Sequence, residues 1–407
     1  MLRSYLSRLH QSVFTLPSAF WVLWSGTLVN RTGTLVLPFL TLYLTSVRHV
    51  SVKEAGLVAG FAGVGGILAS FSMSMIADRI NRCYLLSLVL GIAALLMLPI
   101  LFISSLPLLI IVVLLWSTVS EIQRPLSQVL VIDIVPSTQR QQSIALLRTA
   151  INGGAALGGV LGGLITAVAY IPLFLIDAGT NLFFALLTFF RFSAQPSPIQ
   201  QKEKPFPFVL SFAPLRKPAF LLLCLSTFCA ATIDSQLYSI FPVYLLQIGG
   251  TTSLYGGLLA SNAVLIVLVE FPLATAVSRF SPTRNMFVGY LLVTAAVGTC
   301  LFAYSPLLFI LPVLTFTIGE SLFAPSSATV VANIALPDQR NAFVGLSWMA
   351  VNLGFIAGPI LGGSLLHLSP LLYWVALLVV GLLSMIFAWS IPQDIADVSY
   401  SEQAREG

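Results

Sequence analysis

Long apolar stretches dominate this sequence and leave it few possible folds. A helix that spans a bilayer needs about 20 mostly apolar residues, and short polar segments separate twelve such stretches here. A membrane β-barrel would instead show short strands of alternating polarity, a pattern that this sequence does not sustain. The sequence therefore predicts an all-α membrane protein with twelve transmembrane helices. We expect them at about 18–44, 55–77, 84–104, 106–132, 143–168, 171–191, 219–246, 255–277, 285–304, 306–332, 342–366 and 369–391.

Composition supports a lipid environment. Of the 407 residues, 57% are hydrophobic and 8% are charged, whereas about a quarter of the residues in a soluble domain are charged. A soluble fold of this size could not cover its surface with so few polar groups. The start, MLRSYLSRLHQSVF, is basic but is followed by no small-residue cleavage site, so we interpret it as a retained cytoplasmic segment.

The distribution of Lys and Arg predicts the orientation. Twelve spans place both termini on one side of the membrane, and that side collects fourteen basic residues against two on the other. Because cytoplasmic loops carry the excess of Lys and Arg, we expect both termini in the cytoplasm. The fourteen are Arg3, Arg8, Arg79, Arg82, Arg140, Arg191, Lys202, Lys204, Arg216, Lys217, Arg279, Arg284, Arg340 and Arg405, and the two are Arg48 and Lys53.

The chain repeats itself at an offset of 200 residues. RTAINGGAALGGVLGG at 148–163 corresponds to WMAVNLGFIAGPILGG at 348–363, and Pro125 and Pro325 also match. Two parallel six-helix repeats around a site at the membrane midplane are a transporter architecture. The proline-rich segment between them cannot form one continuous helix. We expect an N-terminal six-helix bundle at 1–192, a cytoplasmic linker at 193–218, a C-terminal six-helix bundle at 219–391 and a cytoplasmic tail at 392–407.

Glycine recurs every fourth residue in the fifth helix of each half. Residues at this spacing share one helix face, and small residues there let helix backbones approach closely in lipid. Close packing is the simpler interpretation, and a further role in coupling is the alternative. The residues are Gly154, Gly158 and Gly162 in the first copy, and Gly354, Gly358 and Gly362 in the second, which also has Pro359 in place of Gly159.

Two motifs resemble those of the major facilitator superfamily, and the resemblance covers essentially the whole chain. SMIADRINRC, after the second span, is similar to that family's G-x-L-A-D-R-x-G-R-R loop: Asp78, Arg79 and Arg82 match, whereas Ser74 and Asn81 replace the glycines. The resemblance implies a cytoplasmic loop that helps to latch the outward-facing state. Glu270 and Arg279, at the corresponding end of the eighth helix, are expected to belong to this gate.

The fifth-helix glycines are similar to the family's antiporter motif G-x-x-x-G-P-x-x-G-G. The motif's proline is absent at Gly159 and present at Pro359, and the arginine that drug antiporters carry in helix four is replaced by Val113. NRTGTLVLPFLTLYL and RPLSQVLVIDIVP resemble bacterial efflux-type members. The resemblance thus implies an efflux transporter, although two of its signatures are incomplete.

Eight charged residues lie within the predicted spans, in addition to Arg191 at the last position of the sixth span. A charge at mid-bilayer costs about 2.5–3.5 kcal/mol or more, so each requires an explanation. Five acids cannot all pair with three arginines, and a buried carboxyl without a cation favours its neutral form, which suits a proton-coupled cycle. The eight are Arg31, Arg124, Arg148, Glu121, Asp177, Asp234, Glu270 and Glu320.

Depth in the membrane separates these candidates. Asp234 is the first candidate for the proton carrier, followed by Glu320 and Glu121, because they lie near the middles of helices expected to line a central cavity. For Asp234, a structural hydrogen bond or an ion pair with Arg31 is the alternative. Glu121 has Arg124 three residues away on its own helix face, so a local ion pair is the simpler interpretation there.

The remaining intramembrane charges have structural interpretations. Arg148 lies near a cytoplasmic helix end, where its side chain can reach the interface, and Asp177 is expected to be a structural anchor. Polar and aromatic residues beside the charges are candidates for the cavity lining, which would favour lipophilic neutral or cationic cargo. These candidates are Asn30, Gln123, Gln236, Tyr238, Asn262 and Trp348.

Other classes of protein lack their motifs in this sequence. No lysine follows a glycine, so no phosphate-binding loop is present, and no HExxH or GxSxG motif occurs. The scattered Cys83, Cys224, Cys229 and Cys300 indicate neither a disulfide framework nor a metal site. We therefore expect a transporter and not an enzyme, without cofactor or metal and with no nucleic-acid partner.

The sequence favours proton-coupled efflux of a small organic compound. Export of a siderophore or an organic acid, and proton-coupled uptake of a metabolite, stay open because specificity resides in a few cavity side chains. The partners expected are the small-molecule substrate, protons and the lipid bilayer. The expected location is the bacterial inner (cytoplasmic) membrane, and the family resemblance favours a monomer.

Overall fold

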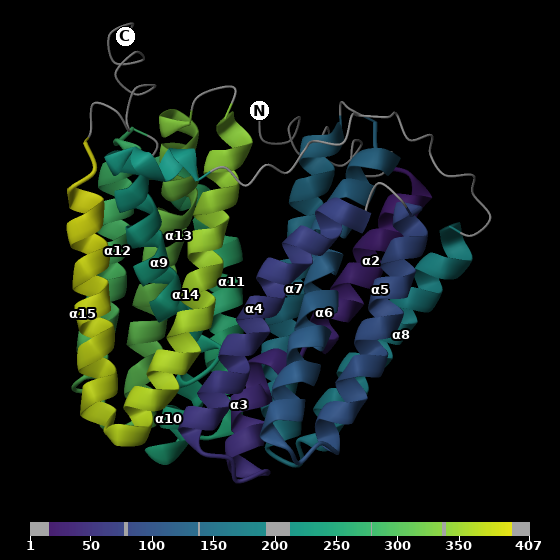
Figure 1. Ribbon diagram of the computed structural model, residues 1–407, viewed down its shortest axis with the longest axis horizontal. Helices are drawn as coiled ribbons and strands as arrows, with labels where there is room; N and C mark the ends of the chain where they lie inside the picture. Colours follow the sequence, from purple (N-terminus) through teal and green to yellow (C-terminus); the bar gives the residue numbers. More distant parts are fainter. Residues whose placement is uncertain are drawn as a thin grey trace, which may run out of the picture.

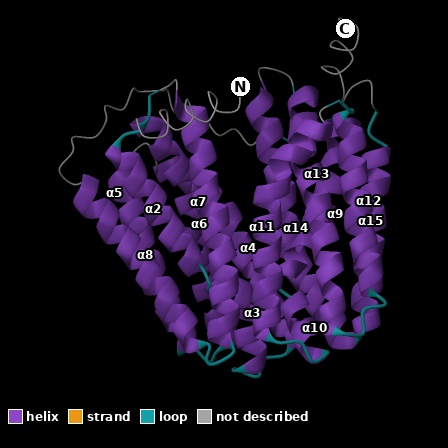
Figure 2. Ribbon diagram, turned by 180° about the vertical axis from the view of Figure 1, so that it is seen from behind, coloured by secondary structure: helices purple, strands orange, loops and turns teal. Residues whose placement is uncertain are grey.

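The computed structural model describes residues 16–76, 80–136, 139–192, 212–277, 279–335 and 339–392. Within these ranges the chain forms helices, turns and loops, and no strand, as Figure 2 shows. The prediction of an all-α protein is thus confirmed.

The helices follow one another with short connections. The first half contains α2 (Ser18–Gly33), α3 (Val36–Ser46), α4 (Val52–Ile76), α5 (Arg82–Met97) with η1 (Leu98–Leu101), α6 (Leu106–Ile134), α7 (Arg140–Thr166) and α8 (Ile171–Phe192). The second half contains η3 (Ala213–Arg216), α9 (Pro218–Leu237), α10 (Phe241–Gln247), α11 (Thr252–Val277), α12 (Pro282–Cys300), η4 (Pro306–Phe309), α13 (Ile310–Ile334), α14 (Arg340–Leu368) and α15 (Pro370–Trp389).

Ten helical segments in the described part of the chain are long and apolar enough to cross a membrane. Two further predicted spans, at 18–44 and 285–304, fall outside that set. The first is divided between α2 and α3, which have 16 and 11 residues. The second corresponds to α12, which begins with the polar run Pro-Thr-Arg-Asn.

The first and seventh predicted spans are each broken into two helices, so their prediction as continuous helices is wrong. Proline clashes with the carbonyl group four residues before it in a helix. For Pro38 that residue is Thr34, where α2 has ended, and for Pro242 it is Tyr238, where α9 has ended. Each proline lies in the first turn of the next helix, where its missing N–H costs nothing.

The two halves lie side by side as two helical bundles (Figure 1). They meet at the end of the molecule where α3 and α10 lie, and splay apart toward the end where α2 begins and α15 ends. One buried apolar core includes side chains of both halves, such as Phe39 and Tyr255. A second core, around Phe20 and Phe184, is confined to the first half.

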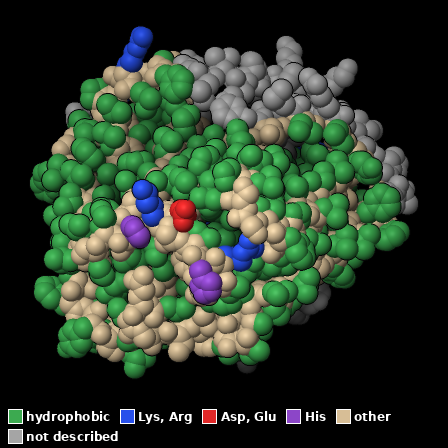
Figure 3. All heavy atoms as spheres, turned by 60° about the horizontal axis from the view of Figure 1, so that its bottom comes forward, with side chains coloured by type: hydrophobic (Ala, Val, Ile, Leu, Met, Phe, Trp, Pro, Cys, Tyr) green, Lys and Arg blue, Asp and Glu red, His purple; other side chains and the backbone are tan. Residues whose placement is uncertain are grey.

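The surface at the α3 and α10 end carries few charged groups. Figure 3 shows mainly apolar and uncharged side chains on this face. The loop between α3 and α4 contributes Arg48, whose guanidinium donates to the carbonyls of Leu101 at 3.0 Å and Ile103 at 2.6 Å. The Arg48 guanidinium therefore links the loop between α3 and α4 to the segment at the end of η1.

Candidate functional site

Two helix pairs join the halves, α4 with α14 and α7 with α11. Glycines bring the backbones together. A Cβ atom on Gly163 would lie 2.7 Å from the carbonyl oxygen of Thr252 and 2.9 Å from Cα of Gly256, and one on Gly56 would lie 3.0 Å from Cα of Gly363. Since real Cβ atoms do not approach so closely, only glycine permits these two contacts. We call these two helix pairs the seams.

The every-fourth-residue glycines face the other way, into their own half. A Cβ atom on Gly154 would lie 2.6 Å from Cβ of Arg31, and one on Gly158 would lie 3.0 Å from the carbonyl oxygen of Thr32. The second copy repeats this arrangement against α9, where Gly354 meets Ala231, Gly358 meets Thr232 and Gly362 meets Gln236. Each motif thus has two faces: one packs against the broken helix of its own half, and the other, which includes Gly163 and Gly363, forms a seam.

Asp177 on α8 supports the break in the first span. Its Oδ2 atom accepts hydrogen bonds from the backbone N–H groups of Leu35 and Val36, both at 3.1 Å, where α3 begins. Its Oδ1 atom accepts a bond from Nδ2 of Asn181 at 2.9 Å. A carboxylate is favoured at a helix N-terminus because the free N–H groups and the helix dipole both point at it. Asp177, 1% exposed, therefore acts as a structural anchor.

Asn30 and Gln123 extend this network inside the first half. Gln123 donates to Oδ1 of Asn30 at 2.8 Å, and Asn30 donates to Oδ1 of Asn181 at 3.0 Å. Both side chains are buried. In this conformation the two side chains are hydrogen-bonded to each other and to Asn181, and so they link α2 to α6 and α8.

A cluster of charged side chains on α2 and α6 lies next to this network. Glu121 and Arg124 form an ion pair at 3.4 Å between Oε2 and Nε. Arg31 on α2 is subject to the charges of Glu121, Asp177 and Arg124. Among the described residues its Nε atom has no hydrogen-bond acceptor. This wall of the first half thus places two arginines, Arg31 and Arg124, near two acids, Glu121 and Asp177.

The opposite wall, in the second half, is acidic. Asp234 on α9 and Glu320 on α13 are close enough for their charges to repel each other. Glu320 accepts a bond from Nδ2 of Asn262 at 3.5 Å, and the same amide nitrogen donates to Thr317 at 2.9 Å. Oδ1 of Asp234 is buried and accepts no hydrogen bond from the described residues. None of the ion pairs between described residues involves Asp234.

Tyr238 connects the two walls electrostatically. It lies at the break between α9 and α10, and its hydroxyl donates to Oδ1 of Asn262 at 3.5 Å. The charges of Asp234 and Glu320 act on it from one side, and that of Arg124 acts from the other half. A molecule between the halves would thus meet carboxyl groups on one side and guanidinium groups on the other.

An ion pair bridges the halves along the seam between α7 and α11. Nη2 of Arg148 on α7 lies 3.1 Å from Oε1 of Glu270 on α11. The side chains are 60% and 30% exposed, so the pair is accessible and its attraction is moderate. Sequence analysis treated the two residues separately. The repeat could not reveal the pair, because the equivalent positions are Trp348 and Ser70.

Part of the predicted gating motif can be located. Nη1 of Arg82 lies 2.8 Å from Oδ2 of Asp133, so α5 is tied to the end of α6 within one half. The guanidinium of Arg279 lies 5.0 Å from the ring centre of Phe280. Asp78 and Arg79 lie outside the described residues. Of the described members of the predicted gate, Arg82 forms an ion pair within its own half and Glu270 forms one across the halves, and the gating role stays a prediction.

Two candidate cavity residues lie away from the charged walls. Gln236 is 4% exposed and packs against Gly362 on the interior side of α9. Trp348 is 62% exposed on α14, at the position that corresponds to Arg148. Of the six cavity candidates, Tyr238 and Asn262 are the two that the structure brings next to the acidic pair.

The chain is similar throughout its length to membrane transporters. A family model described as Major Facilitator Superfamily matches residues 23–265 and 223–406. "Uncharacterized MFS-type transporter YqjV" of Bacillus subtilis (strain 168) is 28% identical over 351 residues, which make up 84% of this chain and 85% of the relative. "Multidrug resistance protein MdtH" of Aeromonas hydrophila is 28% identical over 271 residues, 63% of this chain and 66% of that protein. Among solved structures, the nucleoside transporter NupG superposes with a TM-score of 0.80 at 12% identity, over 92% of this chain and 98% of that chain.

Proposed function

This chain belongs to the Major Facilitator Superfamily and is a multi-pass membrane transporter, and we propose that it exports small organic compounds in exchange for protons. The proposal places it in the cytoplasmic (inner) membrane, as a monomer with twelve spans and both termini in the cytoplasm. Transport by this route makes and breaks no covalent bond, so we propose no enzymatic step.

The observation that carries the proposal is the acidic pair, Asp234 and Glu320. Two carboxyl groups whose charges repel each other in a poorly solvated site cannot both ionise without a large cost, so at least one of them favours its protonated form. A cation that binds to the pair removes that cost and displaces the proton. Proton and cargo then compete for one site, which is the requirement for exchange. Glu121 is a weaker candidate because Arg124 already neutralises it.

The contacts between the halves support a conformation that is closed at the external end. If the termini are cytoplasmic, the α3 and α10 end is external, and there the halves are joined by several bonds. The hydroxyl of Tyr255 donates to the carbonyl of Pro38 at 3.1 Å, and Thr41 donates to the carbonyl of Ser239. The bundles diverge toward the other end (Figure 1). Cargo would thus load from the cytoplasm, and closure of Arg82, Glu270 and Arg279 would accompany the outward-facing state.

The relatives support export over uptake. The name of MdtH describes multidrug resistance, and the acidic wall favours a lipophilic cation or neutral compound. The arginines Arg31 and Arg124 keep a bound anion, such as an organic acid or a siderophore, as the second candidate for the cargo. Direction and cargo are therefore the outcomes that the following experiment distinguishes.

Proton movement in inverted membrane vesicles tests this function. A panel of lipophilic cations, neutral drugs and organic acids is added after a pH gradient has formed. We expect at least one cationic or neutral compound to dissipate the gradient with the wild type, and Asp234→Asn or Glu320→Gln to abolish the response. Glu121→Gln is the matched control and should retain it. If no compound moves protons, or if both carboxyl variants behave like the wild type, proton-coupled export is wrong, and uptake into whole cells becomes the next measurement.

A further inference from the structure

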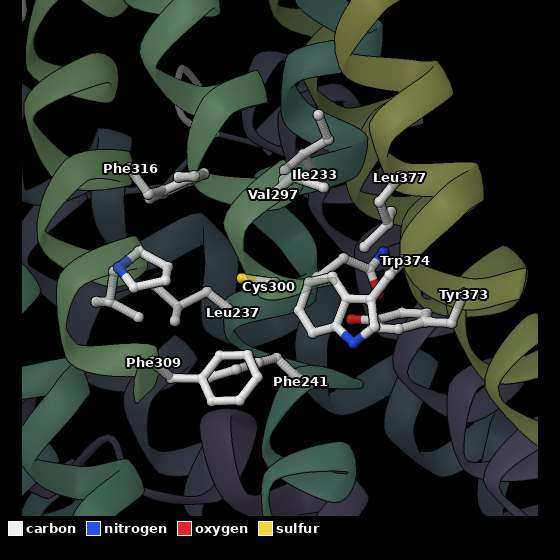
Figure 4. A pocket seen from close by; sticks show the side chains of 14 residues that line it. Ile233, Leu237, Phe241, Val297, Cys300, Phe309, Phe316, Tyr373, Trp374 and Leu377 are labelled. Atoms are coloured by element: carbon white, nitrogen blue, oxygen red, sulfur yellow. The ribbon is translucent and has the colours of Figure 1, made fainter. Parts of the chain in front are cut away.

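An aromatic pocket lies inside the second half, apart from the charged walls. Its cavity volume is about 60 Å³, and its lining comes from α9, α10, η4, α12, α13 and α15. Figure 4 shows Phe241, Phe309 and Trp374 on its aromatic side, with Cys300 beside them. Phe309 and Trp374 are nearly parallel, with ring centres 5.8 Å apart and an angle of 26° between the rings. The walls thus present flat apolar surfaces.

The pocket and the acidic pair use different faces of α9. Asp234 and Tyr238 are four residues apart and share one face. Ile233 and Leu237, also four residues apart, share the neighbouring face and line the pocket. A molecule in the pocket would therefore be separated from the cargo site by α9 itself.

Three buried polar atoms at the pocket have no hydrogen-bond partner among the described residues. They are Oε1 of Gln236, the hydroxyl of Tyr373 and Nε1 of Trp374. The three residues line the pocket and are 4%, 0% and 6% exposed. Buried polar groups in proteins are almost always hydrogen-bonded, so three such groups in the lining of one pocket favour the binding of a ligand with polar atoms.

The chemistry of these atoms restricts the occupant. The indole N–H of Trp374 can only donate, the amide oxygen of Gln236 can only accept, and the hydroxyl of Tyr373 can do either. One hydroxyl group, which both donates and accepts, satisfies this set. The lining residues contain no Asp, Glu, Lys, Arg or His, so a charged ligand would lack a counter-ion.

We propose that this pocket binds a small neutral aromatic alcohol of the phenol class. Its ring lies among Phe241, Phe309 and Trp374, and its hydroxyl bonds to the three unpartnered atoms. The site is distinct from the proposed cargo site. It contacts Gln236 on α9 and Phe241 on α10, on either side of the break at Tyr238, so an occupant restrains the angle between these helices.

Fluorine NMR on the full-length protein in lipid nanodiscs tests the site. The probes are 4-fluorophenol and fluorobenzene, which differ in the hydroxyl group. We expect saturable binding of 4-fluorophenol, about tenfold tighter than that of fluorobenzene because hydrogen bonds to otherwise unpaired buried groups are gained. Trp374→Phe, which removes one donor and keeps an aromatic ring, should weaken 4-fluorophenol about fivefold and leave fluorobenzene unchanged. Cys300→Phe fills the pocket and should abolish saturable binding of both probes.

Contrary results would overturn the proposal. Binding that never saturates, or that persists in Cys300→Phe, would mean that the probe dissolves in lipid or binds elsewhere. Equal affinities of the two probes would remove the role of the hydroxyl, and no binding at all would indicate a pocket that holds only water. Each variant is accepted only if its thermal midpoint stays near that of the wild type. Gln236→Leu replaces Trp374→Phe, and Val297→Phe replaces Cys300→Phe, if the first choice fails to fold.

Discussion

At the residue scale, charged side chains in this protein differ in how completely they are paired. Asp177 has three hydrogen-bond donors and a structural task, namely to hold the start of α3. Asp234 has a buried oxygen atom without a donor among the described residues. Burial without partners is costly for a carboxyl group, so a structural acid should be fully bonded, whereas an acid that exchanges protons should not. The two aspartates fit these opposite descriptions.

Asp177→Leu should lower the stability of the protein by about 3 kcal/mol, because it leaves two buried backbone N–H groups without an acceptor and removes one of the two acceptors of the Asn181 amide. Asp177→Asn keeps one acceptor oxygen and should cost about 1–2 kcal/mol. Thermal unfolding in detergent measures both. Asp133→Asn, at the more exposed ion pair with Arg82, is the control and should cost less than about 1 kcal/mol. Equal losses for the Leu and Asp133 variants would contradict the anchoring role.

At the element scale, the two glycine motifs determine which helices pack against α7 and α14. One face of α7 holds α2 and α3, and the opposite side meets α11. On α14, likewise, one face packs against α9 of the same half, and the other face packs against α4 across the seam. Where glycines let two helix backbones approach closely, no large side chains interlock, so the helices can shift against each other. We infer that the halves move along these two seams.

Gly256 and Gly257, neighbours on α11, provide a matched test of the seam. A Cβ atom on Gly256 would lie 2.7 Å from Cα of Gly163, whereas none of the atoms around Gly257 lies within 4 Å of its Cβ position. Gly256→Ala should therefore separate α7 from α11 and reduce transport at least tenfold, since backbone atoms cannot yield as a flexible side chain can. Gly257→Ala should keep transport and gain up to about 1 kcal/mol of stability from helix propensity. Transport rate and thermal midpoint are measured for both, and similar behaviour of the two variants would disprove the close approach.

At the scale of the whole molecule, the bonds between the halves are unevenly distributed. The end with α3 and α10 has Tyr255, Thr41 and the seam contacts, together with an apolar core shared by both halves. Farther from that end, the ion pair of Arg148 and Glu270 crosses between the halves. Because this pair is partly exposed, it can break at little cost. The ion pair therefore favours the present conformation without holding the protein in it.

Breaking that ion pair should shift the balance away from the present conformation by about fivefold or less, since an exposed pair contributes up to about 1 kcal/mol. Spin labels at Gln139→Cys and Gln339→Cys, equivalent positions before α7 and α14, report the distance between the halves at the end opposite α3 and α10. Arg148→Ala, Glu270→Ala and the double variant should shift the distance distribution equally, because all three remove one interaction. Arg191→Ala, whose partner Ser18 lies in the same half, should leave it unchanged. Additive shifts of the single variants would show that the two residues act separately.

The sequence by itself determined the helical membrane fold, the internal repeat and the family. These follow from local properties, since length and apolar content decide whether a segment can span lipid. It also contained the signals for the two broken spans, Pro38 and Pro242, although the positions of the breaks were not predicted. The functional roles of the candidate residues stay predictions.

Only the tertiary structure decided which distant residues meet. Asp234 and Glu320 are 86 positions apart, and Arg148 and Glu270 are 122 positions apart, in different halves. The repeat does not relate the partners of either pair, because their charges occupy non-equivalent positions. How closely such residues approach depends on how each helix is rotated about its axis and on where two helices cross. Those quantities arise from the packing of glycine faces against one another, a property of the assembled bundles and not of a single segment.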